Sequence, residues 1–264
     1  MKFKADTHLH GDYSNDSSID YRRLCLKAIK HNYKYLVITE HYDLADSELV
    51  NFGLLPLKYY FNELELLRSE YPELEIVTGL EIGEPHLTMD RLQGLFKYFQ
   101  PDFLIGSLHV TRSGKNVSLR FEREVSKECI TEYYEDNLEM VEKGGFDTLG
   151  HLGIFKRSVS TSTMPDESHA YPIIDEIFRT MIKNNIALEV NNSGFKSNLK
   201  NHVPDPVILA RYKKLGGELI TVSSDSHDLD HFDRFYDKTL DNLRELNFSC
   251  MWIKRDGKWV NLEI

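Results

Sequence analysis

The sequence predicts an α/β protein, a distorted (β/α)7 TIM-like barrel that forms a single domain over residues 1–264. Seven short apolar runs alternate with amphipathic helical stretches, which is the pattern of a parallel sheet with helical crossovers. The length of 264 residues is close to that of a typical α/β barrel. Neither GxGxxG nor GxxxxGKS/T follows the first strand, which removes the commonest reasons for choosing the alternative, an open doubly wound sheet.

The predicted strands are short runs of apolar and β-branched residues. Runs such as YLVIT and LITVS contain no charged side chain, as expected of strands that are covered on both faces. In chain order the strands are Phe3–Thr7, Tyr35–Thr39, Glu75–Leu80, Phe103–Ser107, Asp147–Gly150, Ala187–Val190 and Leu219–Ser223.

Helical stretches fill the intervals between the strands, and capping signals mark several of their ends. Thr88 is expected to cap a short helix, and Gly144-Gly145 and Gly216-Gly217 end two others. The tail from Cys250 to Leu262 predicts a hairpin that turns at Asp256-Gly257. The longer predicted helices are Asp20–His31, Pro56–Glu70, Glu128–Lys143, His169–Asn184, Pro206–Leu215 and Asp230–Leu246.

Composition excludes several classes of protein. The chain has 32 Lys and Arg against 42 Asp and Glu, a net charge of −10, which argues against a nucleic-acid partner. No apolar run reaches the roughly 18 residues that a membrane span needs, so we expect no membrane association. The first residues lack the apolar segment of a secretory signal, and the three cysteines form no disulfide framework. These observations predict a cytoplasmic protein.

Histidines and carboxylates follow the ends of the predicted strands. Six of the 11 histidines fall within a few residues of a strand end. In a parallel barrel these ends converge at one face, where reactive groups gather. The positions concerned are Asp6, His8, His10, Glu40, His41, Glu81, His109, His151, Glu189, Asn191, Asn192, Asp225 and His227.

Metal binding is the physical reason for such a set. His8 and His10 are two residues apart on a strand, so their side chains share one face. Imidazole nitrogen and carboxylate oxygen are ligands that zinc, iron and manganese all accept. Because one zinc takes only three or four protein ligands, the number of candidates predicts two or three divalent ions (Zn, Fe or Mn), with Glu81 as the best bridging carboxylate.

Eight short motifs in this chain resemble those of one enzyme family. They are HLH (His8–His10), YSND (Tyr13–Asp16), EH (Glu40-His41), GLEIG (Gly79–Gly83), GSLH (Gly106–His109), GH (Gly150-His151), EVNNSG (Glu189–Gly194) and SSDSH (Ser223–His227). In this order they resemble the PHP family, the polymerase-and-histidinol-phosphatase family of metal-dependent phosphoesterases. The resemblance implies a distorted (β/α)7 barrel with up to three metals, and the length and EVNNSG are most similar to the family's histidinol-phosphatases.

The resemblance also implies three sets of metal ligands. Asp16 is the softest assignment, because many relatives have histidine there and Asp12 lies nearby as a rival. The first ion would take His8, His10, Glu81 and Asp225; the second would share Glu81 and take His109 and His151; the third would take Asp16, His41 and His227.

The expected reaction is hydrolysis of a small phosphate monoester. A hydroxide that bridges the metals would attack phosphorus in line, with Glu81 holding the ions. Asp225 or a histidine at the rim of the cluster, such as His227, would hand a proton to the leaving alkoxide. The resemblance implies L-histidinol as the leaving group.

Cationic side chains are expected to bind the phosphate group. Lys156 and Arg157 follow the fifth strand, and Lys196 follows the sixth. Arg157 is the first choice because the guanidinium fork matches phosphate oxygens.

Two other functions stay open at this point. One is hydrolysis of a different phosphoester, such as a phosphotyrosine, a nucleotide or an oligonucleotide. The other is a non-catalytic metal-binding module, which would predict missing ligands, whereas every core ligand is present. The sequence does not predict an oligomeric state.

Overall fold

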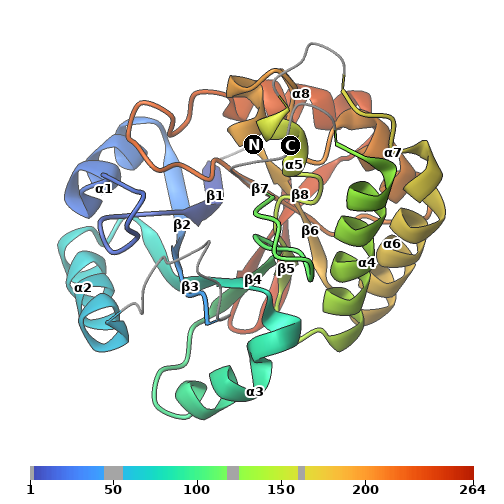
Figure 1. Ribbon diagram of the computed structural model, residues 1–264. Helices are drawn as coiled ribbons and strands as arrows, with labels where there is room; N and C mark the ends of the chain where they lie inside the picture. The colour runs from blue at the N-terminus through green and yellow to red at the C-terminus, as the bar shows by residue number, and fades with distance from the viewer. Residues whose placement is uncertain (1–2, 45–55, 118–124, 160–163) are drawn as a thin grey trace.

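The barrel predicted from the sequence is present in the structure, a computed structural model that describes residues 3–44, 56–117, 125–159 and 164–264. Seven parallel strands pair in chain order, from β1 to β7, in one sheet. Helices surround this sheet on the outside (Figure 1). The strands are β1 (Lys4–Leu9), β2 (Tyr33–His41), β3 (Glu75–Gly83), β4 (Phe103–Ser107), β5 (Thr148–Leu149), β6 (Ala187–Asn191) and β7 (Ile220–Ser223).

Most helices lie close to their predicted positions, but the four-residue helix α5 (Phe155–Ser158) was not predicted. In the described part of the chain, none of them is both long and apolar enough to span a membrane. They are α1 (Tyr21–Lys30), α2 (Leu57–Glu70), α3 (Pro85–Phe96), α4 (Lys127–Lys143), α5 (Phe155–Ser158), α6 (Tyr171–Asn184), α7 (Pro206–Lys214) and α8 (Tyr236–Glu245), with short 3-10 turns η1 (Ser168–Ala170) and η2 (Asn192–Lys196).

Two of the predicted helix starts are wrong. Helix α3 begins at Pro85, not after Thr88, because proline suits the first helical position; Thr88 instead donates its hydroxyl to the carbonyl of Glu84, at 3.2 Å. Helix α8 begins at Tyr236 instead of near Asp230. Asp233 has a φ of 72°, a left-handed conformation that a continuous helix does not allow.

The sheet is nearly closed, and the contacts that close it join the end of β1 to the segment after β7. A regular ladder does not join β7 to β1; instead, Asp225 N donates to the His8 carbonyl at 3.0 Å, and His10 N donates to the Ser226 carbonyl at 3.2 Å. The Thr7 hydroxyl adds a bond to the carbonyl of Val222 at 3.2 Å. The segment after β7 is therefore held directly against the end of β1.

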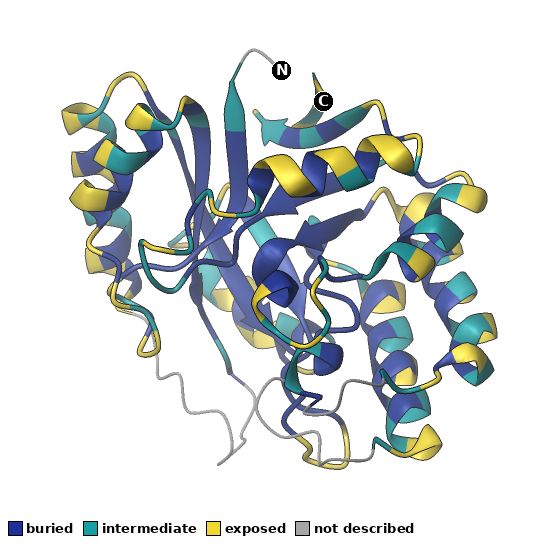
Figure 2. Cartoon of the chain, turned by 90° about the horizontal axis from the view of Figure 1, so that it is seen from above, coloured by how far each residue is buried: buried dark blue, intermediate teal, exposed yellow. Residues whose placement is uncertain are grey.

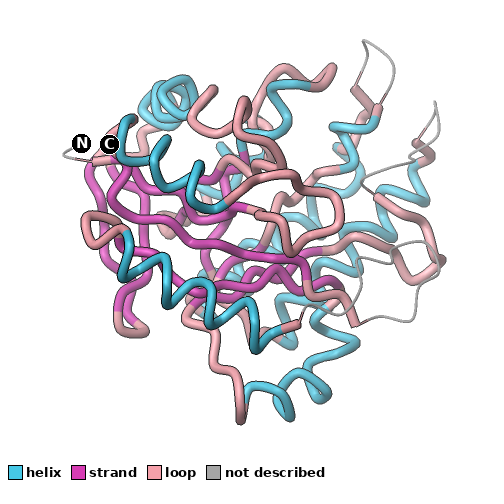
Figure 3. The backbone as a smooth tube through the Cα atoms, turned by 90° about the vertical axis from the view of Figure 1, so that its left-hand side faces the viewer, coloured by secondary structure: helices cyan, strands magenta, loops and turns pink. Residues whose placement is uncertain are grey.

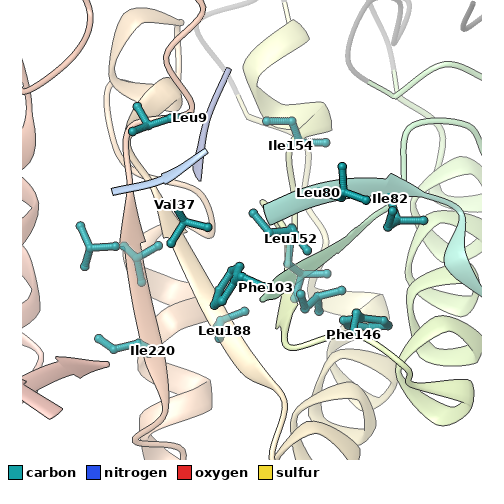
Figure 4. Close-up of a cluster of buried hydrophobic side chains, with 14 of the residues drawn as sticks. Leu9, Val37, Leu80, Ile82, Phe103, Phe146, Leu152, Ile154, Leu188 and Ile220 are labelled. Atoms are coloured by element: carbon teal, nitrogen blue, oxygen red, sulfur yellow. The ribbon is translucent and has the colours of Figure 1, made fainter. Parts of the chain in front are cut away.

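The core lies inside the sheet and between the sheet and its helices. Figure 4 shows Leu9, Val37, Phe103, Leu188 and Ile220 in the same cluster although they come from five different strands, and all of them are buried. Burial of a large apolar side chain stabilises a fold by about 1.5–3 kcal/mol. The apolar strand runs in the sequence are explained by this two-sided burial.

A terminal hairpin covers the amino-terminal end of the barrel. It consists of β8 (Cys250–Arg255) and β9 (Lys258–Glu263) and turns at Asp256-Gly257 as predicted; both turn residues have positive φ. The hydroxyl of Tyr35, in β2, donates to the Lys254 carbonyl at 2.6 Å. Both chain ends lie at this end of the strands (Figure 3), so the opposite end is left for the polar cluster.

Gly106 in β4 is a specific test of this packing. A Cβ at Gly106 would lie 2.7 Å from the ring of Phe146, whereas a Cβ at Gly94, in α3, would meet nothing within 4 Å. We expect Gly106→Ala to lower the free energy of unfolding by about 1–3 kcal/mol in urea titrations. The control Gly94→Ala should raise it by up to about 1 kcal/mol, because alanine favours a helix. Equal effects of the two substitutions would contradict the packing described.

Candidate metal centre

Six strands deliver imidazoles and carboxylates to one point at the carboxyl end of the barrel. This part of the chain is buried even though it is polar, as the dark blue strand ends in Figure 2 show. A small pocket opens there. Ile154 and Arg157 line it together with predicted metal ligands, which are Asp16, His41, Glu81, His109, His151, Asp225 and His227.

The first group of donor atoms surrounds the end of β1. His8 Nε2 lies 2.9 Å from His10 Nε2, so the two-residue spacing does bring both rings to one face. Glu81 Oε2 lies 3.2 Å from His8 Nε2 and 3.4 Å from His10 Nε2. Asp225 Oδ1 completes the group, 3.4 Å from His10 Nε2.

The second group shares Glu81 through its other oxygen. Glu81 Oε1 lies 2.8 Å from His151 Nε2 and 3.2 Å from His109 Nε2. Ser107 donates its hydroxyl to the same oxygen at 2.7 Å. One carboxylate therefore faces both groups, as expected of a bridging ligand.

The third group lies at the rim. Asp16 Oδ2 lies 3.3 Å from His227 Nε2 and 3.6 Å from His41 Nε2. His41 pairs with Glu81 in the sheet register, and its Nδ1 is 2.9 Å from Glu81 Oε2, so this ring lies between the rim group and Glu81. The rival Asp12 lines a different cavity, together with Tyr13, Asp20, Tyr21, Arg22 and Glu63. The geometry thus brings Asp16, and not Asp12, to the cluster.

These spacings fit divalent metal ions. Ligand bonds of about 2.0–2.2 Å in a tetrahedron place neighbouring donor atoms about 3.3–3.6 Å apart. Donor atoms of His8, His10 and Glu81 lie within 4.8 Å of one another, and the same holds for His41, Glu81 and His109, and for His10, His41 and His227. Glu81 Oε2 is buried, and imidazole nitrogens of His8, His10 and His41 lie 2.9–3.4 Å from it. A buried carboxylate oxygen among imidazoles suits a cation.

Three further carboxylates hold the ligands, and sequence reasoning gave them no role. Glu189, fully buried in β6, accepts from the His151 backbone N at 2.5 Å and lies 2.6 Å from His8 Nδ1. Glu84 accepts from the backbone N of His109 at 2.6 Å, and Asp43 Oδ1 lies 3.6 Å from His109 Nδ1. Such outer carboxylates fix the orientation of histidine ligands. The signals for Glu189 were its place at a strand end and its position in the EVNNSG motif.

Comparison with known families agrees with this arrangement. The family described as PHP domain matches residues 6–193, which is more than two thirds of the chain. The chain belongs to the PHP family. The match ends before β7, so Asp225 and His227 lie outside it, although the fold carries them to the ligands of the matched part.

Relatives that are similar over most of the chain are phosphatases. Histidinol-phosphatase of Lactococcus lactis subsp. lactis is 28% identical over 232 residues, which cover 85% of this chain and 84% of the relative. A probable histidinol-phosphatase of Thermotoga maritima is 27% identical over 257 residues, 96% of each chain. The crystal structure of the L. lactis histidinol phosphate phosphatase, complexed with zinc, L-histidinol and phosphate, is similar with a TM-score of 0.85 and 25% identity, over 97% of this chain and 98% of that one.

The predicted phosphate-binding cations lie in different surroundings in this PHP chain. Arg157 lines the pocket, with its Nη1 3.1 Å from Ser193 Oγ and 3.5 Å from Asp225 Oδ2. The side chain of Lys196 is exposed in part; the partly buried surroundings of its ammonium group, together with the nearby charge of Arg157, lower its pKa to about 8. The prediction for Lys156 is wrong: its ammonium is buried between Glu167 and Asp205 and is not part of the pocket lining.

The close contacts in the cluster shift the pKa values of several of its histidines and of Glu81. Burial would lower the pKa of His41, but Glu81 and Asp16 outweigh that effect and raise it to about 10. In the same way, carboxylates raise the pKa of His8, led by Glu189, and of His109, led by Glu81. Burial would raise the pKa of Glu81, but the surrounding imidazoles hold it well below its usual range. The metal-free cluster thus binds protons where the loaded cluster would bind cations.

The shift at His41 predicts how the metal-free protein responds to pH. A histidine whose folded pKa, about 10, exceeds its ordinary value of 6.5 stabilises the fold below pH 6.5, and this contribution is lost as pH rises towards 10. We therefore expect the thermal midpoint of chelator-treated protein to fall between pH 6.5 and 10. His41→Gln should show a shallower fall over the same range, and an unchanged slope in that variant would contradict the assignment.

Proposed function

We propose that this chain is a metal-dependent phosphomonoesterase that hydrolyses L-histidinol phosphate to L-histidinol and phosphate. The observation that carries the proposal is the convergence of three donor groups around Glu81, beside a pocket that Arg157 lines. The relatives named histidinol-phosphatase, which match over 85–96% of this chain, support the choice of substrate. The complex of the similar L. lactis enzyme with zinc, L-histidinol and phosphate supports it further.

The residues around Glu81 would hold two or three divalent ions, of which zinc is the best supported. His8, His10 and Asp225 would share one ion with Glu81, His109 and His151 a second, and the rim residues Asp16, His41 and His227 a third. When bound, such ions neutralise the charge of a phosphate ester and lower the pKa of water at the site.

The protein's own residues would bind and orient the ester. Arg157 offers two parallel N–H donors that fit phosphate oxygens, and its partner Ser193 keeps it turned towards Asp225. Asp225 Oδ2 accepts from Asn191 Nδ2 at 3.2 Å, which fixes its plane while Oδ1 faces His10. The carboxylate of Asp225 would therefore be held in place as a metal ligand, while Arg157, 3.5 Å from it, would bind the phosphate oxygens.

With two ions bound and the rim group free of metal, His227 would be a better proton donor to the leaving alkoxide than Asp225. In the metal-free protein, burial would lower the pKa of His227, but Asp16 and Asp225 outweigh that effect and raise it above its ordinary value. Its neighbours His8 and His10 hold the pKa of Asp225 well below its usual range, so that carboxyl keeps no proton to donate. His227 is also the more exposed of the two, at the rim where the alkoxide would leave.

Hydrolysis of another phosphoester is the second candidate function. The net charge of −10 disfavours a long nucleic acid as substrate, but it does not separate histidinol phosphate from phosphotyrosine or a nucleotide.

We further infer a reducing, cytoplasmic setting from the three cysteines, none of which forms a disulfide in the described residues.

A substrate panel tests the assignment directly. We expect the zinc-loaded protein to show its highest kcat/KM on L-histidinol phosphate, at least about tenfold above phosphotyrosine and a short oligonucleotide, a difference of about 1.4 kcal/mol. Phosphate release in a coupled assay provides the measurement. A higher kcat/KM on either alternative would transfer the activity to that substrate, and no turnover of any ester by zinc-loaded protein would support the non-catalytic module.

Substitution of Glu81 tests the bridging role. Glu81→Gln removes the charge that two donor groups share, so we expect less than half of the wild-type zinc content and a kcat lower by at least about 100-fold. Metal analysis of the purified protein gives the first value. Glu75→Gln, at the opposite end of the same strand, is the matched control and should keep full zinc content. Full zinc occupancy in Glu81→Gln would refute the bridging role.

A further inference from the structure

A buried ion cluster lies directly behind the proposed phosphate-binding arginine. Lys156 in α5 is only 4% exposed, and its ammonium contacts the carboxylates of Glu167 and Asp205. We call these three residues the triad. Tyr134, in α4, donates its hydroxyl to Glu167 at 2.5 Å. Nothing in the proposed reaction uses these charges, and stability alone does not require them, because apolar residues can often replace a buried ion pair without loss of stability.

The triad and the pocket hold adjacent residues of one helical turn. Lys156 points into the triad, while its neighbour Arg157 points to Ser193 and Asp225. Successive side chains on a helix diverge by about 100°. A rotation of α5 that moved Lys156 would therefore also move Arg157 away from its two partners.

Helix α5 cannot keep this orientation by itself. It has only four residues, and such a short helix is not stable without external contacts. The Phe155 ring packs against Tyr133 and Tyr134, with ring centres 5.0 and 6.2 Å apart. Ring packing holds α5 against α4 but is weakly directional, whereas charge-assisted hydrogen bonds to two carboxylates define the direction of Lys156.

The triad is also tied to β6, the strand that leads into the turn η2, where the partner of Arg157 lies. Asp205 caps α7, accepting from Val207 N at 2.9 Å. Two residues earlier, Val203 exchanges backbone hydrogen bonds of 2.8 and 2.9 Å with Asn191, at the end of β6. Ser193 follows Asn191 closely and accepts the bond from Arg157. One connected set of bonds thus sets both the direction of Arg157 and the place of its partner.

We propose that the triad of Lys156, Glu167 and Asp205 is a positioning device that holds Arg157 in its phosphate-binding orientation. The proposal rests on the proposed function, since it takes Arg157 as a ligand of a phosphate group. Lys156 acts through Arg157 and does not touch the substrate. The inference replaces the sequence-based view of Lys156 as a phosphate ligand.

A charge-neutral replacement of the triad tests the proposal. In Lys156→Met/Glu167→Gln/Asp205→Asn no unpaired charge is left buried, and asparagine can still cap α7. We expect this variant, loaded with zinc, to bind inorganic phosphate roughly tenfold more weakly in calorimetric titrations, with a similar rise in KM and unchanged zinc content. Lys156→Arg, which keeps the charge, should restore binding to within about twofold. Should the neutral variant fail to fold, Tyr134→Phe removes only the bond to Glu167 and should weaken phosphate binding in the same direction.

A double-mutant cycle separates positioning from a general structural role. In an Arg157→Met background the triad replacement should cause no further loss of phosphate affinity, because the residue through which it acts is gone. Asp175→Asn/Arg211→Met removes a comparable ion pair of 2.8 Å between α6 and α7 and should leave phosphate binding unchanged. An equal loss in the Arg157→Met background would overturn the proposal. Since phosphate binding needs no turnover, failure to hydrolyse histidinol phosphate would remove only the substrate assignment.

Discussion

The buried carboxylate of Glu81 is the contact on which the rest of this site depends. Its two oxygens lie within 3.4 Å of imidazole nitrogens of residues in β1 and β2 or just after β1, β4 and β5. An ionised carboxylate away from water costs several kcal/mol unless positive charge compensates it. Protons on the imidazoles supply that charge in the metal-free protein, and divalent ions would supply it in the loaded one. The same cluster therefore serves both the stability of the barrel mouth and the proposed chemistry.

Closure of the barrel completes this cluster. Backbone hydrogen bonds join His8 and His10 to Asp225 and Ser226, and they hold the segment after the last strand of the sheet against the end of the first. Asp225 and His227 thereby reach ligands that precede them by more than 200 residues. This contact is irregular: Leu9 and Ser226 form an isolated parallel bridge in place of a regular ladder.

Two neighbouring cationic residues that follow β5, Lys156 and Arg157, have different roles. Arg157 remains in contact with the pocket, while Lys156 is neutralised by two carboxylates inside the protein. Arginine suits the first task because its fork matches an oxyanion, and lysine suits the second because a compact ammonium can bind two carboxylates at once. A one-turn helix can present both only because residues from α4, the start of η1 and the start of α7 hold it.

The sequence by itself determined the seven strands, the terminal hairpin and the His8–His10 pair, because apolar runs, an Asp-Gly turn and a two-residue spacing act locally along the chain. It also determined that carboxylates and histidines would meet, since parallel strands end at one face. Only the tertiary structure decided between Asp12 and Asp16, separated Lys156 from Arg157, and revealed Glu189 and Glu84 as supports of His8, His151 and His109. The tertiary structure also decided where α8 begins, because the left-handed conformation of Asp233 interrupts a sequence pattern that is typical of a helix. In each of these cases the direction of a side chain or the end of an element is set by segments far away in the sequence, and no local pattern encodes that.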